Sequence, residues 1–246
     1  MTDLDRAYWI AWYNLPEAGR DAYLAWVRVR YIPLVLDRSG VLWCAHYASE
    51  ESVIPLGGGK GRVSHVKPDA VPAGDRYILI FGATEAHAFA HPSPLRFHAD
   101  LPREDRQMLA MREGERMNVM LEEARVEGPE PADHPLAPSP CIQLGSFNSG
   151  SLEEEDEMLT WYAQWRLPSM KQVPGCVRVR KLVSVSGWAK HACFYEFTSL
   201  EARNAHFVHY ERANPEMEAW SKRVVRNTIH APGSANVARR ISVEVK

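Results

Sequence analysis

Apolar runs typical of strands alternate with helix-like segments along this chain, and the alternation occurs twice. In the first half, runs of aromatic and β-branched residues predict strands over 8–13, 41–47 and 77–81. Apolar residues spaced three and four apart predict a helix over 17–31, which Pro33 is expected to end. Methionines at helical spacing predict a longer helix over 103–125.

The second half repeats this order with clearer signals. Ser151 with Glu154 three residues later forms a capping box, which predicts a helix start, and Pro174 with Gly175 predicts its end. A further helix is expected over 200–210. Strands are expected over 141–148, 177–186, 188–197 and 237–245, with Gly187 as the turn between the second and the third.

The two halves share one register. Trp26, Ile32 and Pro33 recur 135 residues later as Trp161, Leu167 and Pro168. Five prolines predict a stiff linker over 128–140, between a first repeat at 1–127 and a second at 141–246. We therefore expect an α+β fold in which two tandem ferredoxin-like repeats pack sheet against sheet around a barrel-shaped cavity.

Composition narrows the class of protein. The chain has 246 residues, of which 46% are hydrophobic, and a formal net charge of −2 without a basic stripe, which disfavours a nucleic-acid partner. No apolar run reaches the ~20 residues that span a bilayer, and the acidic start lacks the apolar core of a signal peptide. The four cysteines show no CxxC spacing and are expected to be reduced thiols. We expect a cytoplasmic protein with no membrane partner.

The stretch from Trp161 to Pro168, followed by Pro174-Gly175 and a strand with arginines, resembles the EthD-like branch of the dimeric α+β barrel superfamily. The resemblance implies a barrel that binds a small molecule; the superfamily includes cofactor-free monooxygenases, isomerases and haem proteins. The helix histidines of that branch are absent here. Their positions are taken by Arg30, Tyr31, Trp165 and Arg166.

Two histidines on predicted strands are candidate acid–base groups. His46 follows Cys44 by two residues and His191 precedes Cys193 by two, so each pair shares one strand face, which Tyr195 continues in the second half. Histidine titrates near neutral pH, so His46 and His191 are the predicted catalytic residues. The alternatives are two hydrogen-bonded structural histidines or a zinc site built from both pairs.

Three weaker motifs are not assigned to a functional site. The pairs His87/His91 and His206/His209 have helical spacing but lack the glutamate of a zinc-protease motif, so they are interpreted as solvated helix ends, with axial haem ligation as the alternative. The run 57–61 departs from a phosphate loop at both ends and is expected to be a mobile lid.

The sequence thus predicts a cofactor-independent isomerase, lyase or monooxygenase that acts on a small aromatic or lactone-like compound, with no metal. The predicted substrate-binding residues are Trp12, Asn14, Arg30, Tyr31, Trp165, Arg166 and Tyr195. Loss of the helix histidines favours a non-catalytic ligand-binding or assembly protein as the alternative, and haem binding is the third possibility. A homodimer is expected if strand edges stay unpaired.

Overall fold

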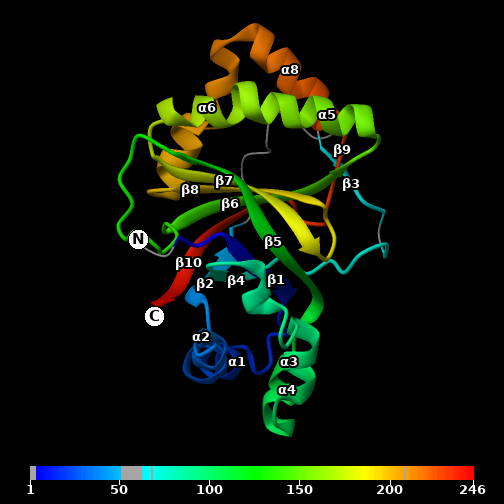
Figure 1. The fold of residues 1–246 in the computed structure, drawn as a ribbon, viewed down its shortest axis with the longest axis vertical. Helices are drawn as coiled ribbons and strands as arrows, with labels where there is room; N and C mark the ends of the chain where they lie inside the picture. The colour runs from blue at the N-terminus through cyan, green and yellow to red at the C-terminus, as the bar shows by residue number, and fades with distance from the viewer. Residues whose placement is uncertain (1–3, 51–62, 68, 208) are drawn as a thin grey trace.

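Eight antiparallel strands close into a barrel with helices at both ends (Figure 1). The computed structural model describes residues 4–50, 63–67, 69–207 and 209–246. The first half has strand order β2-β4-β1-β5 and contributes β1 (Ala7–Asn14), β2 (Val41–Ser49), β4 (Tyr77–Ala83) and β5 (Glu113–Glu127). The second half has order β7-β8-β6-β10 and contributes β6 (Cys141–Ser149), β7 (Cys176–Ser186), β8 (His191–Phe197) and β10 (Asn236–Val245).

The halves therefore have the same topology, and the predicted fold class is confirmed. Two seams, β5 with β7 and β10 with β2, join them into one closed sheet. A two-stranded extension, β9 (Thr228–His230) and β3 (Ser64–His65), continues from β6. The segment 128–140 between the halves contains no helix or strand, and its Leu136 packs against the barrel interior.

Helices cover the outer face of each half-sheet (Figure 1). The first half carries α1 (Arg20–Trp26), α2 (Ile32–Leu36), α3 (Pro94–Asp100) and α4 (Arg103–Leu109), with a 3-10 turn η2 (Ala86–Phe89). The second half carries α5 (Leu152–Trp161), α6 (Leu167–Ser169), α7 (Leu200–Ala202) and α8 (Pro215–Arg226), with 3-10 turns η4 (Met170–Gln172) and η6 (Tyr210–Ala213).

The expectation that Pro33 ends the first helix is wrong. A π-helical turn, η1 (Val27–Tyr31), precedes it, and α2 continues through the proline. The Ile32 N–H bonds to the Val27 carbonyl, five residues back, so the wider turn tolerates a residue that has no N–H to donate. The second half has the same arrangement, with the π-helical turn η3 (Tyr162–Arg166) before Pro168.

The helix predicted over 103–125 is also wrong. The helix α4 ends at Leu109, and β5 starts at Glu113. Gly114, the second residue of β5, has φ +60°, and its carbonyl accepts the Gly74 N–H at 2.8 Å. Pairing with β1 on one side and β7 on the other outweighs the helical spacing of the methionines, because tertiary contacts override weak local propensity.

The barrel interior is packed with side chains, which corrects the expected cavity between the sheets. Large residues point inward from both halves, among them Tyr8, Trp12, Trp43, Tyr47 and Phe194. One end of the interior holds a buried ion network in which Arg180 bonds to Glu196 and Asp5. Two further cores lie on the outer faces of the barrel, beneath the helices of each half.

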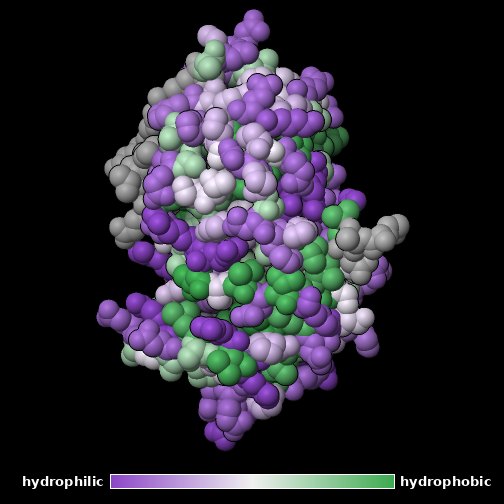
Figure 2. Space-filling model, turned by 90° about the vertical axis from the view of Figure 1, so that its left-hand side faces the viewer, coloured by the Kyte–Doolittle hydropathy of each residue, from purple (hydrophilic) through white to green (hydrophobic). Residues whose placement is uncertain are grey.

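Apolar side chains gather on the half of the surface that contains α1, α2 and the end of β10 (Figure 2). Exposed apolar residues in the described chain include Leu4, Ile241 and Val245. None of the described helices has the length and apolar character needed to span a membrane.

Candidate functional site

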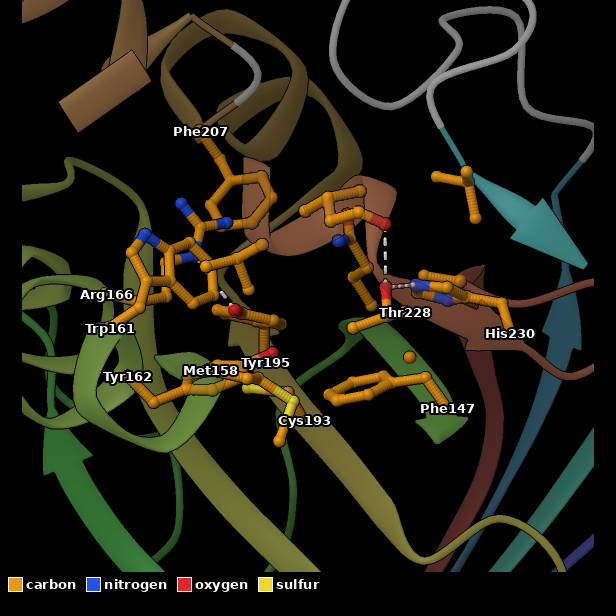
Figure 3. Close-up of a pocket in the computed structure, with 16 residues that line it drawn as sticks. Phe147, Met158, Trp161, Tyr162, Arg166, Cys193, Tyr195, Phe207, Thr228 and His230 are labelled. Atoms are coloured by element: carbon orange, nitrogen blue, oxygen red, sulfur yellow. Dashed lines mark hydrogen bonds between the residues drawn. The ribbon is translucent and has the colours of Figure 1, made fainter. Parts of the chain in front are cut away.

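A cavity of about 110 Å³ lies between the outer face of the second half-sheet and its helices. An apolar cavity of about 150 Å³ can hold benzene, so this smaller cavity has room for one ring at most. Figure 3 draws the residues of its wall and labels Phe147, Met158, Trp161, Tyr162, Arg166, Cys193, Tyr195, Phe207, Thr228 and His230.

Strand alternation decides which residues reach the cavity. On β6, Gln143, Gly145 and Phe147 point outward toward the helices, while the residues between them face the barrel interior. On β8, Cys193 and Tyr195 share that outward face. Above them, α5 and η3 place the aromatic residues Trp161 and Tyr162 as a lid, with Arg166 one turn further along. The helix starts where the capping box predicts, because the Ser151 hydroxyl accepts the Glu154 N–H.

Arg166 and Tyr195 form the polar end of the cavity. The Arg166 Nε donates to the Tyr195 hydroxyl at 2.9 Å, and the guanidinium lies 4.6 Å from the centre of the Phe207 ring. Figure 3 shows this pair on the opposite side of the cavity from Thr228 and His230. The arrangement offers hydrogen-bond donors beside aromatic walls, which suits a flat ligand that carries an acceptor oxygen.

The titratable groups beside this pair stay protonated at neutral pH. Burial raises the pKa of the Cys193 thiol to about 11. Burial also raises the pKa of Tyr195 and, more strongly, that of Tyr162. Arg166 therefore supplies the formal charge in this part of the wall at pH 7.

His230 at the other end is held as a neutral ring. Thr228 donates its hydroxyl to the Val225 carbonyl at 2.8 Å, so it accepts from His230 Nε2 at 3.1 Å. Ser234 accepts the Ser146 N–H at 2.8 Å, so its hydroxyl donates to His230 Nδ1 at 3.2 Å. Burial lowers the pKa of His230 to about 3, with a smaller contribution from His65. Both ring nitrogens of His230 are thus occupied by hydrogen bonds, and the ring only lines the cavity.

The corresponding space in the first half is filled. Asn14 and Asn148 lie at equivalent positions near the ends of β1 and β6. The Asn14 side-chain oxygen accepts two backbone N–H groups from a neighbouring segment, and that of Asn148 accepts one. In this alignment Trp9 occupies the place of Gln143. The rings of Tyr31, Phe81, Phe89, Phe97 and His98 surround Trp9, with centres 5.4–6.4 Å away. Of the two repeats, the second carries the open site.

The predicted catalytic histidines both lie on the outer side of the barrel, and neither is part of the cavity wall. His46 Nε2 lies 2.8 Å from the Tyr13 hydroxyl. Burial lowers the pKa of His46 to about 3, and the positive charge of Arg112 contributes to this decrease as the smaller cause. His191 bonds to Lys181 at 3.0 Å and to Glu155 at 2.9 Å. Burial, followed by the charge of Lys181, lowers the pKa of His191. Their catalytic role stays a prediction.

Of the predicted substrate-binding residues, the structure brings Arg166 and Tyr195 together and separates the others. Trp12 lies in the barrel interior beneath the Arg116 guanidinium, and Asn14 caps a neighbouring loop. Trp165 stacks on Tyr210 outside the cavity. In the first half, Arg30 bonds to Asp105 at 3.3 Å and Tyr31 bonds to His98 at 2.6 Å.

Sequence reasoning missed several residues of the wall. Strand alternation places Gln143 and Phe147 on one face with Tyr195, so the first two were recognisable once the strands were paired. Met158, Trp161 and Tyr162 follow the helical spacing that ends at Arg166. Phe207, Thr228 and His230 carry no local signal, because a π-helical turn, η5 (Arg203–Phe207), and the short strand β9 bring them in.

The described residues do not fit a metal or haem. No group of three metal-binding side chains occurs among them. Cys44 and His46 lie in the first-half core and Cys193 in the second-half core, so the two pairs do not meet as a zinc site. The cavity is far smaller than a haem, and His230 has no nitrogen left for iron. The pairs His87/His91 and His206/His209 are exposed, and the loop 57–61 lies outside the described residues.

Comparisons with solved structures agree with this architecture. A candidate monooxygenase from Fusobacterium nucleatum superposes with a TM-score of 0.60 at 8% identity, covering 100% of this chain and 96% of the other. The fold is of the dimeric α+β barrel type, an antiparallel barrel with helices on its outer faces. An anthrone oxidase-like protein superposes on this barrel with a TM-score of 0.61 at 9% identity, covering 98% and 93%.

A chlorite dismutase from Candidatus Nitrospira defluvii superposes on the barrel with a TM-score of 0.51 at 12% identity, covering 98% of this chain and 92% of the other. No family model and no curated protein sequence matches the chain. At these identities the likeness concerns the fold, which hosts different chemistries.

Proposed function

We propose that this protein is a cofactor-independent enzyme that binds a one-ring aromatic or lactone-like compound in the second-half cavity and stabilises its ionised oxygen. The observation that carries the proposal is the Arg166–Tyr195 pair, joined at 2.9 Å and set against aromatic walls. Donors fixed in a water-poor site stabilise a developing phenolate or enolate strongly, because they need no reorganisation.

Stabilising such an anion is a step that isomerisation, elimination and oxygenation of these compounds share. The similar structures include a candidate monooxygenase, an anthrone oxidase-like protein and a chlorite dismutase, so they support an enzyme without selecting the reaction. We also propose that the protein belongs to the EthD-like branch, that it is cytoplasmic and that it forms a homodimer.

A second candidate is a non-catalytic binding protein. It is favoured by the lack, in the described wall, of a base that titrates near pH 7, since His230 is held neutral. The two candidates differ in turnover, because an enzyme converts an ionisable one-ring compound and a binding protein releases it unchanged. Chromatography of the compound after incubation with the protein distinguishes the two.

Binding of benzoate, measured by calorimetry, tests the site. We expect Arg166→Gln to weaken binding at least about tenfold, because a hydrogen bond to a charged group contributes about 1.5–3 kcal/mol. Tyr195→Phe, which removes one hydroxyl, should weaken it about fivefold. The matched control is Arg103→Gln on the exposed face of α4, which should bind as the wild type does. Equal affinity in Arg166→Gln and in the control would refute the site.

A further inference from the structure

We infer that Gln143 is a third hydrogen-bond donor to the bound oxygen and that Arg203 is the positioning residue that turns its amide toward the cavity. This inference rests on the proposed function, and it adds a third donor to the ionised oxygen and the residue that positions that donor.

Gln143 lies beside the Arg166–Tyr195 pair. It is directly opposite Tyr195 across the β6–β8 pairing, and both side chains point toward the helices. Side chains at such opposed positions have Cβ atoms about 4.5–5.5 Å apart. The side chains of Gln143 and Tyr195 therefore leave the sheet next to each other and line the same wall of the cavity.

Arg203 fixes the orientation of that amide. Its Nε and Nη2 reach the Gln143 Oε1 at 2.9 and 2.5 Å. A guanidinium has donors only, so the oxygen of the amide must face Arg203 and the NH₂ group must point away from it. Among the described residues that NH₂ group has no partner, and Gln143 borders the cavity.

Arg203 is a buried cation with amide partners. Its side chain is 2% exposed, and its remaining hydrogen bond runs to the Asn204 side-chain oxygen at 2.6 Å. A charge so placed polarises the amide that it holds, which strengthens the donors on the far side. The first-half counterpart of Gln143 is Trp9, whose ring fills the corresponding space, so an amide held by an arginine occurs at the open site and not at its first-half equivalent.

The cavity end thus combines the Arg166 guanidinium, the Tyr195 hydroxyl and the Gln143 NH₂ group. All three can donate to one oxygen, and the wall as described contributes no carboxylate to this end. Such a set favours an ionised ligand oxygen over a protonated one. A protonated oxygen carries its own O–H donor, which would find no acceptor among these three groups.

The test uses 4-nitrophenol, whose ionised form absorbs visible light and whose protonated form does not. With the full-length protein in excess, the bound phenol should ionise at a pH at least about one unit below that of the free phenol, which is a tenfold preference for the phenolate. Gln143→Glu should abolish this shift, because the carboxylate keeps Arg203 paired but presents an acceptor to the cavity. Gln107→Glu on exposed α4 makes the same change of charge and should keep the shift.

Arg203 is tested by its effect on the same absorbance titration. Arg203→Met should reduce the shift several-fold while 4-nitrophenol still binds, and Arg203→Lys, which can still donate to the Gln143 oxygen, should restore much of it. The thermal unfolding midpoint shows that each variant is folded. A purely structural role for Arg203 would lower that midpoint and leave the shift in place.

The outcomes separate this inference from the proposed function. A bound phenol that titrates like the free one, or a shift that survives Gln143→Glu, overturns the inference and leaves the binding site standing. A wild-type protein that binds neither 4-nitrophenol nor benzoate overturns both.

Discussion

Burial decides what each histidine of this chain can do. His46 and His230 are almost fully buried, and His98 is partly buried; burial lowers the pKa of each to about 3. A neutral imidazole with a fixed partner is a structural element, and the donors that remain for chemistry belong to arginine, tyrosine and glutamine. The polar end of the cavity follows this rule, since Arg166 and Tyr195 offer hydrogen-bond donors there and none of its described residues is a base that titrates near pH 7.

His46 should make stability depend on pH. Its pKa is about 3 in the folded protein and about 6.5 when unfolded, so the unfolded state binds the extra proton between these values. The stabilisation is therefore complete above pH 6.5 and is lost as the pH falls, by roughly 2 kcal/mol at pH 5. Urea unfolding of His46→Gln, which keeps a group to bond Tyr13, should show a shallower slope between pH 6.5 and 4. The exposed His87→Gln should keep the wild-type slope; equal slopes in both variants would contradict the assignment.

At the scale of elements, glycines and π-helical turns determine where strands turn and where helices continue, which local propensity alone does not decide. Gly187 was predicted as the turn between two strands, and it has φ +98° between β7 and β8. The π-helical turns before Pro33 and Pro168 escaped prediction, although their positions follow the 135-residue repeat. The strand β5 was missed because its neighbours β1 and β7, far away in sequence, decide its conformation.

Gly187→Ala should destabilise the protein by about 1–3 kcal/mol. The reason is double: alanine resists a positive φ, and its Cβ would lie 2.3 Å from the Met117 carbonyl oxygen. Chemical denaturation measures the loss. Gly145→Ala is the matched control, because a Cβ there meets its neighbours at an ordinary distance of 3.5 Å or more, and it should change the unfolding free energy by under about 0.5 kcal/mol. A Gly187→Ala variant as stable as this control would refute the argument.

At the scale of the whole molecule, the two repeats differ in whether the space between sheet and helices is filled or open. Both keep the same strand order, but Trp9 and the α3 residues Phe97 and His98 fill the first site, while Gln143 and Gly145 line the open second site. The seams between halves close the barrel within one chain. An ion network at one end of the interior spans both halves, because Asp5 comes from the first and Arg180 and Glu196 from the second.

Arg180→Met should destabilise the whole barrel by about 3–5 kcal/mol, because it leaves the buried Glu196 without its cation and Asp5 with Arg125 as its remaining ion-pair partner. Adding Glu196→Gln should recover part of the loss. The control is Arg223→Met on α8, whose ion pair with Glu157 is half exposed and contributes under about 1 kcal/mol. Denaturant unfolding measures all three, and similar losses for Arg180→Met and the control would show that the network does not hold the halves together.

The sequence alone determined the order of most elements, the repeat and the α+β barrel, because side-chain periodicity and turn residues are local properties. It also placed Arg166 on its helix and Tyr195 on its strand face. Periodicity fixes faces, but it carries no information on which space between faces is filled. Only the tertiary structure decided that the barrel interior is packed, that Trp9 fills the first site, and that Arg203 turns Gln143 toward the second. These outcomes depend on side-chain volume and hydrogen-bond partners that packing brings together from distant parts of the chain.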